Sequence, residues 1–204
     1  MADADATTLV LVRHGEIAAN AARVWHGSTD SELTALGHTQ ARRTAAHLAG
    51  RRPLPSALYT SPLARTRATA ARIAEGLGLE ARLEPGLAEY GIGELEGESY
   101  ADLARVHRFF ERIAGDAEFA PPGGESPRQV IARVSDALRR IARAHRGSQV
   151  VVVSHGAALG FALGALIDGD ANQWERYHLA NCAVSELVLE PTARLLSWNR
   201  TEHL

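Results

Sequence analysis

The sequence predicts an α/β fold, a three-layer α/β/α sandwich around a mostly parallel central sheet. Two observations predict it. Short apolar runs, such as Leu9–Val12 and Val150–Val153, alternate along the chain with segments of helical character. This alternation is typical of strands joined by crossover helices, which build a parallel sheet covered on both faces. The first run is also apolar without interruption, as expected of a strand buried on both faces.

Local signals place the elements in order. Strands are expected at residues 9–12, 57–60, near Leu83, at 150–153, and at 184–189 and 195–198, the last two closing the sheet as a hairpin. Helices are expected from Thr34 to Leu48, from Pro62 to about Gly76, from Ser99 through Phe110, over 130–141 and after Gly156. Thr34 and Ser99 can each cap a helix N-terminus, and Gly50 ends the first helix. Glycine and proline predict loops at 89–97 and 114–127.

Length and composition predict the organisation of the chain. A chain of 204 residues, 46% of them hydrophobic, is long enough to bury the core of one domain. We expect a single domain over residues 1–204, with a lid-like insertion around 97–124. The formal net charge of −2 gives no reason to expect nucleic acid or an anionic membrane as a partner. Any anion must therefore be bound by a local cluster of charge.

The residue types that are scarce or missing exclude several kinds of chemistry. All 22 basic residues are arginine, so neither a Schiff-base lysine nor a P-loop lysine is present. Cys182 is the only cysteine and can form no internal disulfide, which fits a reducing compartment. Residues 1–8 lack a basic start followed by an apolar run, and the apolar stretch 157–167 is too short to span a membrane. A soluble, cytoplasmic protein is expected.

Three predicted strands end in polar side chains that could meet. The residues at these ends are Arg13 and His14, then Thr60, Ser61 and Arg65, and finally Ser154 and His155. In open α/β sheets, ligands bind beyond the carboxyl ends of the strands. Guanidinium groups pair with phosphoryl oxygens, helix N-termini favour their charge, and a neutral imidazole can attack phosphorus. The grouping therefore suits a phosphoryl group.

Seven ordered motifs extend this pattern over most of the chain. They are Val12–Glu16 with Asn20; the segment from Gly27 to Ala41; Ser61–Arg65 with Thr69; Leu87–Glu89 with Gly93 and Glu96; Gly124–Ser126; Ser154–Gly156; and Asn181. At these residues the chain resembles the histidine phosphatase superfamily, in the branch that includes cofactor-dependent phosphoglycerate mutases. The resemblance implies a phosphoglycerate mutase-like fold and a phosphatase that forms a phosphohistidine.

The resemblance also implies the catalytic roles. His14 would be the nucleophile, and Arg13, Arg65 and His155 would hold the phosphoryl oxygens through the transition state. Glu89 would protonate the leaving oxygen and then activate water. His14 must be neutral to attack, and two guanidinium groups nearby would lower its pKa. Because Glu89 must start protonated, we expect a rate optimum on the acidic side of neutral.

Further positions are expected to bind the substrate, a small-molecule phosphate ester. This set comprises Arg13, Asn20, His26, Gly27, Arg65 and Gly156. His26, next to Trp25, could line the pocket or simply pack against its neighbours. No pair of histidines has a zinc-binding spacing, so no metal and no cofactor is expected. The oligomeric state stays open, a homodimer being one option.

Two alternatives stand beside a phosphatase. A mutase of this branch would carry a longer insertion with a lysine and an arginine pair, but the insertion here is short and the chain lacks lysine. A non-catalytic module that binds phosphorylated ligands is the second alternative, and the five filled catalytic positions speak against it. A serine hydrolase is excluded because Ser154 is not flanked by glycines. Ile17 and Gly160 depart from the family pattern and leave the substrate pocket less defined.

Overall fold

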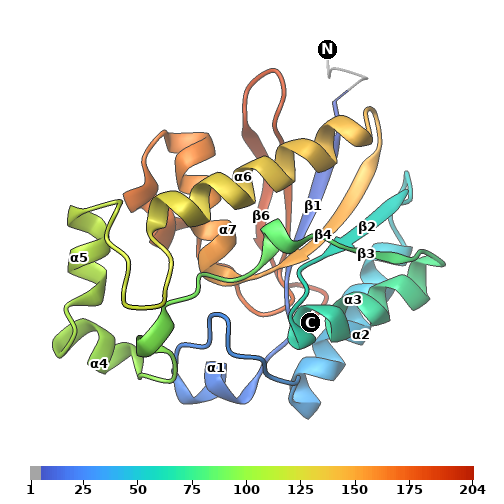
Figure 1. Cartoon of the computed structure of the whole chain (residues 1–204). Coiled ribbons are helices and arrows are strands. Elements are labelled where there is room, and N and C mark those ends of the chain that lie inside the picture. The colour runs from blue at the N-terminus through green and yellow to red at the C-terminus, as the bar shows by residue number, and fades with distance from the viewer. Residues whose placement is uncertain (1–5) are drawn as a thin grey trace.

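A six-stranded sheet lies between two layers of helices in the computed structural model, which describes residues 6–204 (Figure 1). The strands are β1 (Thr8–Arg13), β2 (Ala57–Thr60), β3 (Ala81–Leu83), β4 (Gln149–Ser154), β5 (Val184–Val188) and β6 (Arg194–Arg200). They follow the order β3-β2-β4-β1-β5-β6. The first four run parallel, whereas β5 is antiparallel to β1 and to β6. The predicted mostly parallel sheet and its closing hairpin are confirmed.

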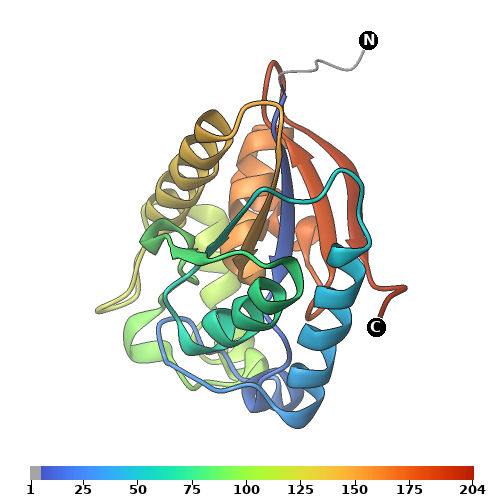
Figure 2. The same ribbon diagram turned by 90° about the vertical axis from the view of Figure 1, so that its right-hand side faces the viewer.

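The side chains of the central strands alternate between two apolar cores. Leu9 and Leu11 of β1 pack with one core, and Val10 and Val12 pack with the other. The first core includes apolar residues of α6 (Pro127–Ala144) and α7 (Gly156–Leu163). The second includes residues of α2 (Ala35–Ala49) and α3 (Ala64–Leu77), which cover the opposite face (Figure 2). A strand with apolar residues at every position is thereby buried on both sides.

The helix N-termini follow local capping chemistry. The Thr34 hydroxyl accepts a hydrogen bond from the Gly37 N–H at the start of α2. The Ser99 hydroxyl does the same for the Asp102 N–H at the start of α4 (Tyr100–Arg105). Ser126 caps α6, and its own N–H donates to the Gln129 side chain at 2.8 Å. Each bond satisfies a backbone donor that has no partner within the helix.

Two features differ from the elements that the sequence predicts. The expected helix from Ser99 through Phe110 is wrong, because it is broken into α4 and α5 (Phe109–Gly115). Arg108 between them has a left-handed backbone with φ of 49°, and Val106 is 69% exposed, so this apolar side chain does not join the core. A short helix, α1 (Ala18–Ala22), was not predicted, since its five residues are too few for a periodic signal.

The carboxyl ends of β1, β2 and β4 lie at one edge of the sheet. At this edge lie α1 and the segment 97–124, which contains α4 and α5 (Figure 1). This segment is joined to the residues after α1 by backbone bonds, among them Trp25 N–H to Glu98 O at 2.9 Å. No helix within residues 6–204 is long and apolar enough to cross a membrane.

Candidate active site

His14 follows the last residue of β1 and is 2% exposed. Its Nδ1 lies 2.7 Å from the Gly15 carbonyl oxygen. Because a carbonyl oxygen can only accept, Nδ1 must carry the proton and Nε2 is left with a lone pair. The Gly15 N–H in turn donates to the Thr69 hydroxyl at 3.0 Å, which fixes this peptide against α3. The imidazole thus presents Nε2 as a free nucleophilic nitrogen.

Burial keeps the His14 ring neutral. Loss of solvation lowers the pKa of His14 well below its usual range, and the charges of Arg13 and Arg65 lower this pKa further. The bond to the Gly15 carbonyl opposes these effects without cancelling them. A neutral imidazole is the form that can attack phosphorus.

His155 faces His14 at a distance of 5.2 Å between ring centroids. Arg65 Nε donates to His155 Nδ1 at 3.2 Å, so Nδ1 is the acceptor and Nε2 carries the proton. That proton is directed to the Ser61 hydroxyl, 2.8 Å away. Burial and the neighbouring arginines lower the pKa of His155 well below its usual range. Ser61, which directly follows β2, is therefore a site residue; the sequence places it at a strand end but does not indicate its role.

Arg65 is fully buried, and backbone carbonyls of the loop that follows Trp25 hold its guanidinium. Nη1 donates to Thr29 O at 2.9 Å, and Nη2 donates to His26 O at 3.1 Å and to Gly27 O at 2.7 Å. Together with the bond from Nε to His155, these contacts use four of the five N–H donors of an arginine. Arg65 therefore brings positive charge to the site and retains one N–H.

Glu96 holds the loop that carries these carbonyls. Its two oxygens accept hydrogen bonds from the N–H groups of Gly27, Ser28, Thr29 and Ile92 and from the two hydroxyls of that loop. Burial alone would raise the pKa of Glu96, but these bonds outweigh it and lower the pKa. Sequence spacing did not distinguish this carboxylate from Glu89, and only the loop geometry does.

Arg13 also has an unused donor. Nη1 donates to Leu179 O at 2.5 Å, whereas Nε is buried and has no hydrogen-bond partner within residues 6–204. The guanidinium lies beside Gly156, where an added Cβ would come within 3.4 Å of Cζ and Nε. A buried donor of a charged group normally has a partner, and here an anion can supply it.

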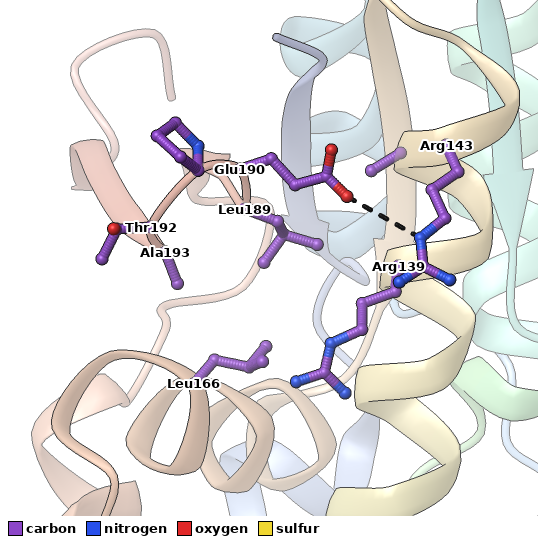
Figure 3. A pocket seen from close by; sticks show the side chains of 9 residues that line it. Arg139, Arg143, Leu166, Leu189, Glu190, Thr192 and Ala193 are labelled. Carbon is purple, nitrogen blue, oxygen red and sulfur yellow. Dashed lines mark ion pairs between the residues drawn. The ribbon is translucent and has the colours of Figure 1, made fainter.

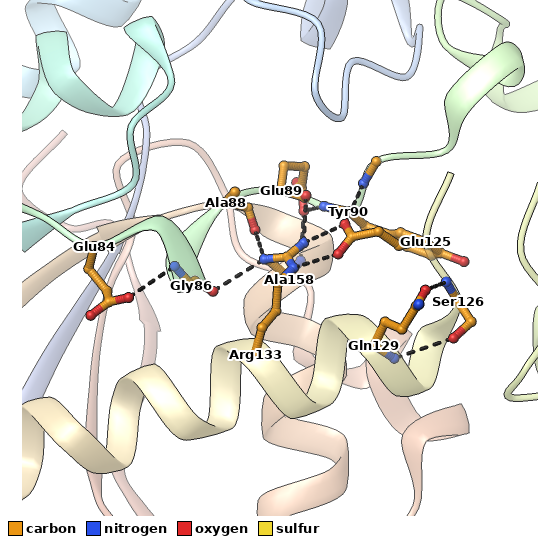
Figure 4. Close-up of polar contacts among 11 residues, drawn as sticks. Glu84, Gly86, Ala88, Glu89, Tyr90, Glu125, Ser126, Gln129, Arg133 and Ala158 are labelled. Atoms are coloured by element: carbon orange, nitrogen blue, oxygen red, sulfur yellow. Dashed lines mark hydrogen bonds and ion pairs between the residues drawn. The ribbon is translucent and has the colours of Figure 1, made fainter. Parts of the chain in front are cut away.

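The Glu89 carboxylate lies at the N-terminus of α7, the helix that follows His155. Oε1 accepts from Ala158 N–H at 2.7 Å and from Tyr90 N–H at 2.9 Å. Oε2 accepts a single longer bond, from Ala157 N–H at 3.2 Å. The carboxyl group is thereby held in one orientation (Figure 4). Oε2 is the less engaged oxygen.

Arg133 of α6 fixes the backbone that carries Glu89. Nη1 donates to Gly86 O and Ala88 O, and Nη2 donates to Glu89 O (Figure 4). Nε and Nη2 also form a paired bond with the Glu125 carboxylate, at 2.7 Å each. All five N–H donors of the Arg133 guanidinium are therefore used. In the sequence Glu125 stands out only as part of a motif, and Arg133 was not predicted, because nothing local marks an arginine that binds distant carbonyls.

Two pockets meet at Arg13. One, of about 410 Å³, is lined by Arg13, Glu89 and Gly156, and the other, of about 480 Å³, is lined by Arg13 and Asn20. The side-chain oxygen of Asn20, Oδ1, accepts hydrogen bonds from Ile17 N–H and from the side-chain amide of Asn181. These two bonds orient the Asn20 side chain.

His26 and Gly27 do not line either pocket. The His26 ring bonds Ser31 Oγ at 2.6 Å, and both residues offer their carbonyls to Arg65. An added Cβ on Gly27 would lie 2.1 Å from Tyr90 O, so this position serves close backbone packing.

A further pocket of about 410 Å³ lies away from these residues, between α6 and the β5–β6 turn (Figure 3). Arg139, Arg143 and Glu190 bring charge to it, with Arg143 Nε 3.7 Å from Glu190 Oε1. All three are partly exposed, and none belongs to the cluster around His14. No group of three or more potential metal-ligating side chains occurs within the described part of the chain.

Comparison with known proteins identifies relatives of this architecture. The family model of the histidine phosphatase superfamily (branch 1) matches residues 9–201. A probable phosphoglycerate mutase of Enterobacter sp. (strain 638) is 34% identical over 189 residues, which cover 92% of this chain and 87% of that protein. A metal-independent phosphoserine phosphatase of Arabidopsis thaliana is 38% identical over 162 residues, covering 77% of this chain and 67% of that protein.

Solved structures agree in fold. A mycobacterial glucosyl-3-phosphoglycerate phosphatase, solved in complex with VO3, superposes with a TM-score of 0.82 and 29% sequence identity. The superposition covers 95% of this chain and 99% of that chain.

Proposed function

The chain belongs to the histidine phosphatase superfamily (branch 1) and is a phosphatase enzyme, and from this premise we propose that it hydrolyses small phosphomonoesters through a phosphohistidine at His14. One observation carries the proposal. His14 Nδ1 is bonded to the Gly15 carbonyl, so the free lone pair is on Nε2. The unpaired Arg13 Nε and the charge of Arg65 supply what a phosphoryl group needs nearby.

The reaction proceeds in two steps. In the first, His14 Nε2 attacks phosphorus, the N–P bond forms, and the bond from phosphorus to the ester oxygen breaks. Glu89 gives its proton to the departing oxygen, so the alcohol leaves neutral. In the second, water attacks phosphorus and passes a proton to Glu89, the N–P bond breaks, and inorganic phosphate leaves. His14 returns to the neutral form and Glu89 is protonated again.

The arginines stabilise the transition state, and His155 is proposed to act through Arg65, whose Nε–H it accepts. Arg13 offers its free Nε–H, and the remaining N–H of Arg65 is the second donor. These fixed positive groups take the role that cations have in other phosphoryl transfers, so the proposed reaction uses no metal. Asn20 and the backbone at Gly156 line the pockets and are proposed to add hydrogen bonds. His26 and Gly27 are proposed to act on the substrate through Arg65.

Hydrolysis is favoured over transfer to a second alcohol. A mutase must hold an acceptor in place of water, and the insertion of this chain has no lysine for that purpose. Tyr100 and Phe110 of the insertion line the pocket at Glu89, so we propose that the insertion acts as its lid.

Trapping the phosphoenzyme tests the proposal. Brief incubation with a ³²P-labelled phosphomonoester should label the protein, and the label should be lost in acid and kept in alkali, as for phosphohistidine. His14→Asn should remove the label and lower kcat by about 10³-fold or more. His38→Asn, on α2, should retain both the label and the rate. Labelling that survives His14→Asn, or a label stable in acid, would contradict the proposed nucleophile.

A further inference from the structure

The pocket at Glu89 has an aromatic wall. Four of its lining side chains, Trp25, Tyr100, Phe110 and Trp174, carry large rings, and each comes from a different segment of the chain. The same pocket holds Arg13 and Glu89. A phosphoryl group at Arg13 would therefore place the alcohol half of the ester against this wall.

The rings follow one another as a continuous surface. Trp25 and Tyr100 lie 5.4 Å apart between centroids, and Tyr100 and Phe110 are stacked at 6.1 Å with an angle of 16°. Phe110 and Trp174 are stacked at 6.2 Å and 21°. Three consecutive rings are thus nearly parallel. Such a surface favours a planar ring, which gains offset-stacked or edge-to-face contacts in addition to apolar burial.

The protein core supports this wall from behind. Trp25 is 3% exposed, and its indole N–H donates to Tyr90 O at 3.2 Å. Phe161, a buried residue of α7, stacks on Trp174 at 5.1 Å and 14°. The wall is therefore built before any ligand arrives, which reduces the ordering cost of binding.

Charge at the pocket does not favour a second anionic group. Arg23 and Glu175 both line the pocket and are exposed, and their charges have opposite signs. Arg13 and His178 also line the pocket: the phosphoryl group takes Arg13, and burial lowers the pKa of His178, which favours its uncharged form. A substrate with a carboxylate would thus meet one acidic and one basic group beyond the phosphoryl position, with no net attraction.

We propose that the preferred substrates are phosphomonoesters whose alcohol carries a planar aromatic or heteroaromatic ring, which packs against Trp174, Phe110 and Tyr100. This inference rests on the proposed phosphatase reaction at His14 and adds the substrate class to it. Phe110 and Trp174 are the specificity-determining residues.

The test compares esters that differ in the ring alone. The purified chain is assayed with 3-phenylpropyl, 3-cyclohexylpropyl, and propyl phosphate, whose alcohols are of similar acidity, so differences in leaving-group chemistry are small. We expect kcat/KM to be at least about tenfold higher for the phenyl ester than for the propyl ester. The phenyl ester should also exceed the cyclohexyl ester and 3-phosphoglycerate.

Variants of the aromatic wall test whether its rings cause the preference for the phenyl ester. Trp174→Ala and Phe110→Leu should each lower the ratio of kcat/KM for phenyl over propyl ester by about tenfold. Phe119→Ala is the matched control, because Phe119 belongs to the same insertion, does not line the pocket and packs on Arg112. Its ratio should stay at the wild-type value.

The possible outcomes distinguish a wrong substrate class from a wrong reaction. Equal kcat/KM for phenyl and propyl esters, equal values for phenyl and cyclohexyl esters, or a preference for 3-phosphoglycerate would overturn the substrate class while the phosphatase stands. An unchanged ratio in folded Trp174→Ala would also overturn it. Failure of the phosphatase itself is separate, since no ester would then be hydrolysed and His14 would not be labelled.

Discussion

His14 and His155 hold their protons on different ring nitrogens. The Gly15 carbonyl keeps the proton of His14 on Nδ1, whereas Arg65 and Ser61 keep that of His155 on Nε2. Neither assignment follows from the residue type, because a neutral imidazole exists in both forms. The partners make one ring a nucleophile with a free Nε2 and the other an oriented donor.

Burial of two neutral histidines predicts that stability depends on pH. The pKa values of His14 and His155 are well below 6.5 in the folded state and return to about 6.5 on unfolding. Between these values the unfolded chain binds more protons, so stability falls as pH decreases below about 6.5 and is fully present above it. Urea unfolding should show a loss of up to about 1.4 kcal/mol per pH unit for each histidine.

The variant His14→Asn should reduce this pH dependence. His38→Asn, at a position outside the site, should leave the slope between pH 5 and 6.5 unchanged. A slope that is the same in His14→Asn and in the wild type would show that this ring becomes protonated in the folded chain.

At the scale of elements, the turn after β1 depends on a close approach between two glycines. An added Cβ at Gly15 would lie 2.5 Å from Gly37 O at the start of α2. Gly15→Ala must therefore displace either the turn or the helix. We expect a loss of about 2 kcal/mol or more in urea unfolding, together with a lower kcat because Gly15 O orients His14.

Gly50→Ala is the matched control for this turn. Gly50 ends α2, and its added Cβ would meet its nearest neighbour, His47 O, at 3.4 Å, an ordinary contact. Its stability should stay within about 0.5 kcal/mol of the wild type. Equal stability of the two variants would mean that the turn shifts to accommodate the added methyl group without lowering the free energy of unfolding.

The hydrogen bonds from Arg133 of α6 to the backbone around Glu89 predict how kcat/KM depends on the leaving group. Arg133→Met removes the donors that hold the carbonyls of Gly86, Ala88 and Glu89. A less well positioned Glu89 matters most when the departing alcohol needs a proton. We expect kcat/KM to fall about tenfold or more for an alkyl phosphate and much less for 4-nitrophenyl phosphate, whose leaving group needs none.

Arg140→Met on the same helix is the control for Arg133→Met. Arg140 forms a more exposed ion pair with Glu84 at 3.0 Å, and such pairs contribute little to stability. It should not alter the ratio between the two substrates. If Arg133→Met lowers both rates equally, its role is structural and does not act through proton transfer.

On the scale of the whole molecule, the fold brings Gly156, directly after β4 and His155, beside Arg13 Nε of β1, a buried donor without a hydrogen-bond partner within residues 6–204. An oxyanion that fills this position should stabilise the folded state. Vanadate at about 100 times its Kd should add about 2.7 kcal/mol to the free energy of unfolding. For a chain of this size, Tm should rise by roughly 5–10 °C in a thermal melt.

Two arginine variants locate the vanadate effect. Arg13→Met should remove most of the rise in Tm, whereas Arg139→Met, in the pocket beyond α6 (Figure 3), should retain it. The reverse result would place the oxyanion at Arg139 and would separate the anion site from His14.

The sequence by itself determined the layers of the fold and most of the residues that meet at its edge. Uninterrupted apolar runs such as Leu9–Val12 require two covering layers, and polar residues at the ends of parallel strands must share one edge. The break at Arg108 was not predicted, because the periodicity of Leu103 and Phe110 continues across it.

Only the tertiary structure decided how those residues are held. Arg65 and Arg133 are fixed mainly by backbone carbonyls, and every residue has a carbonyl, so no sequence pattern marks the partner. The tautomers of the two histidines and the aromatic wall depend in the same way on groups far apart in the chain. Spacing along the sequence records which side chains are available, and their orientation arises when distant segments pack together.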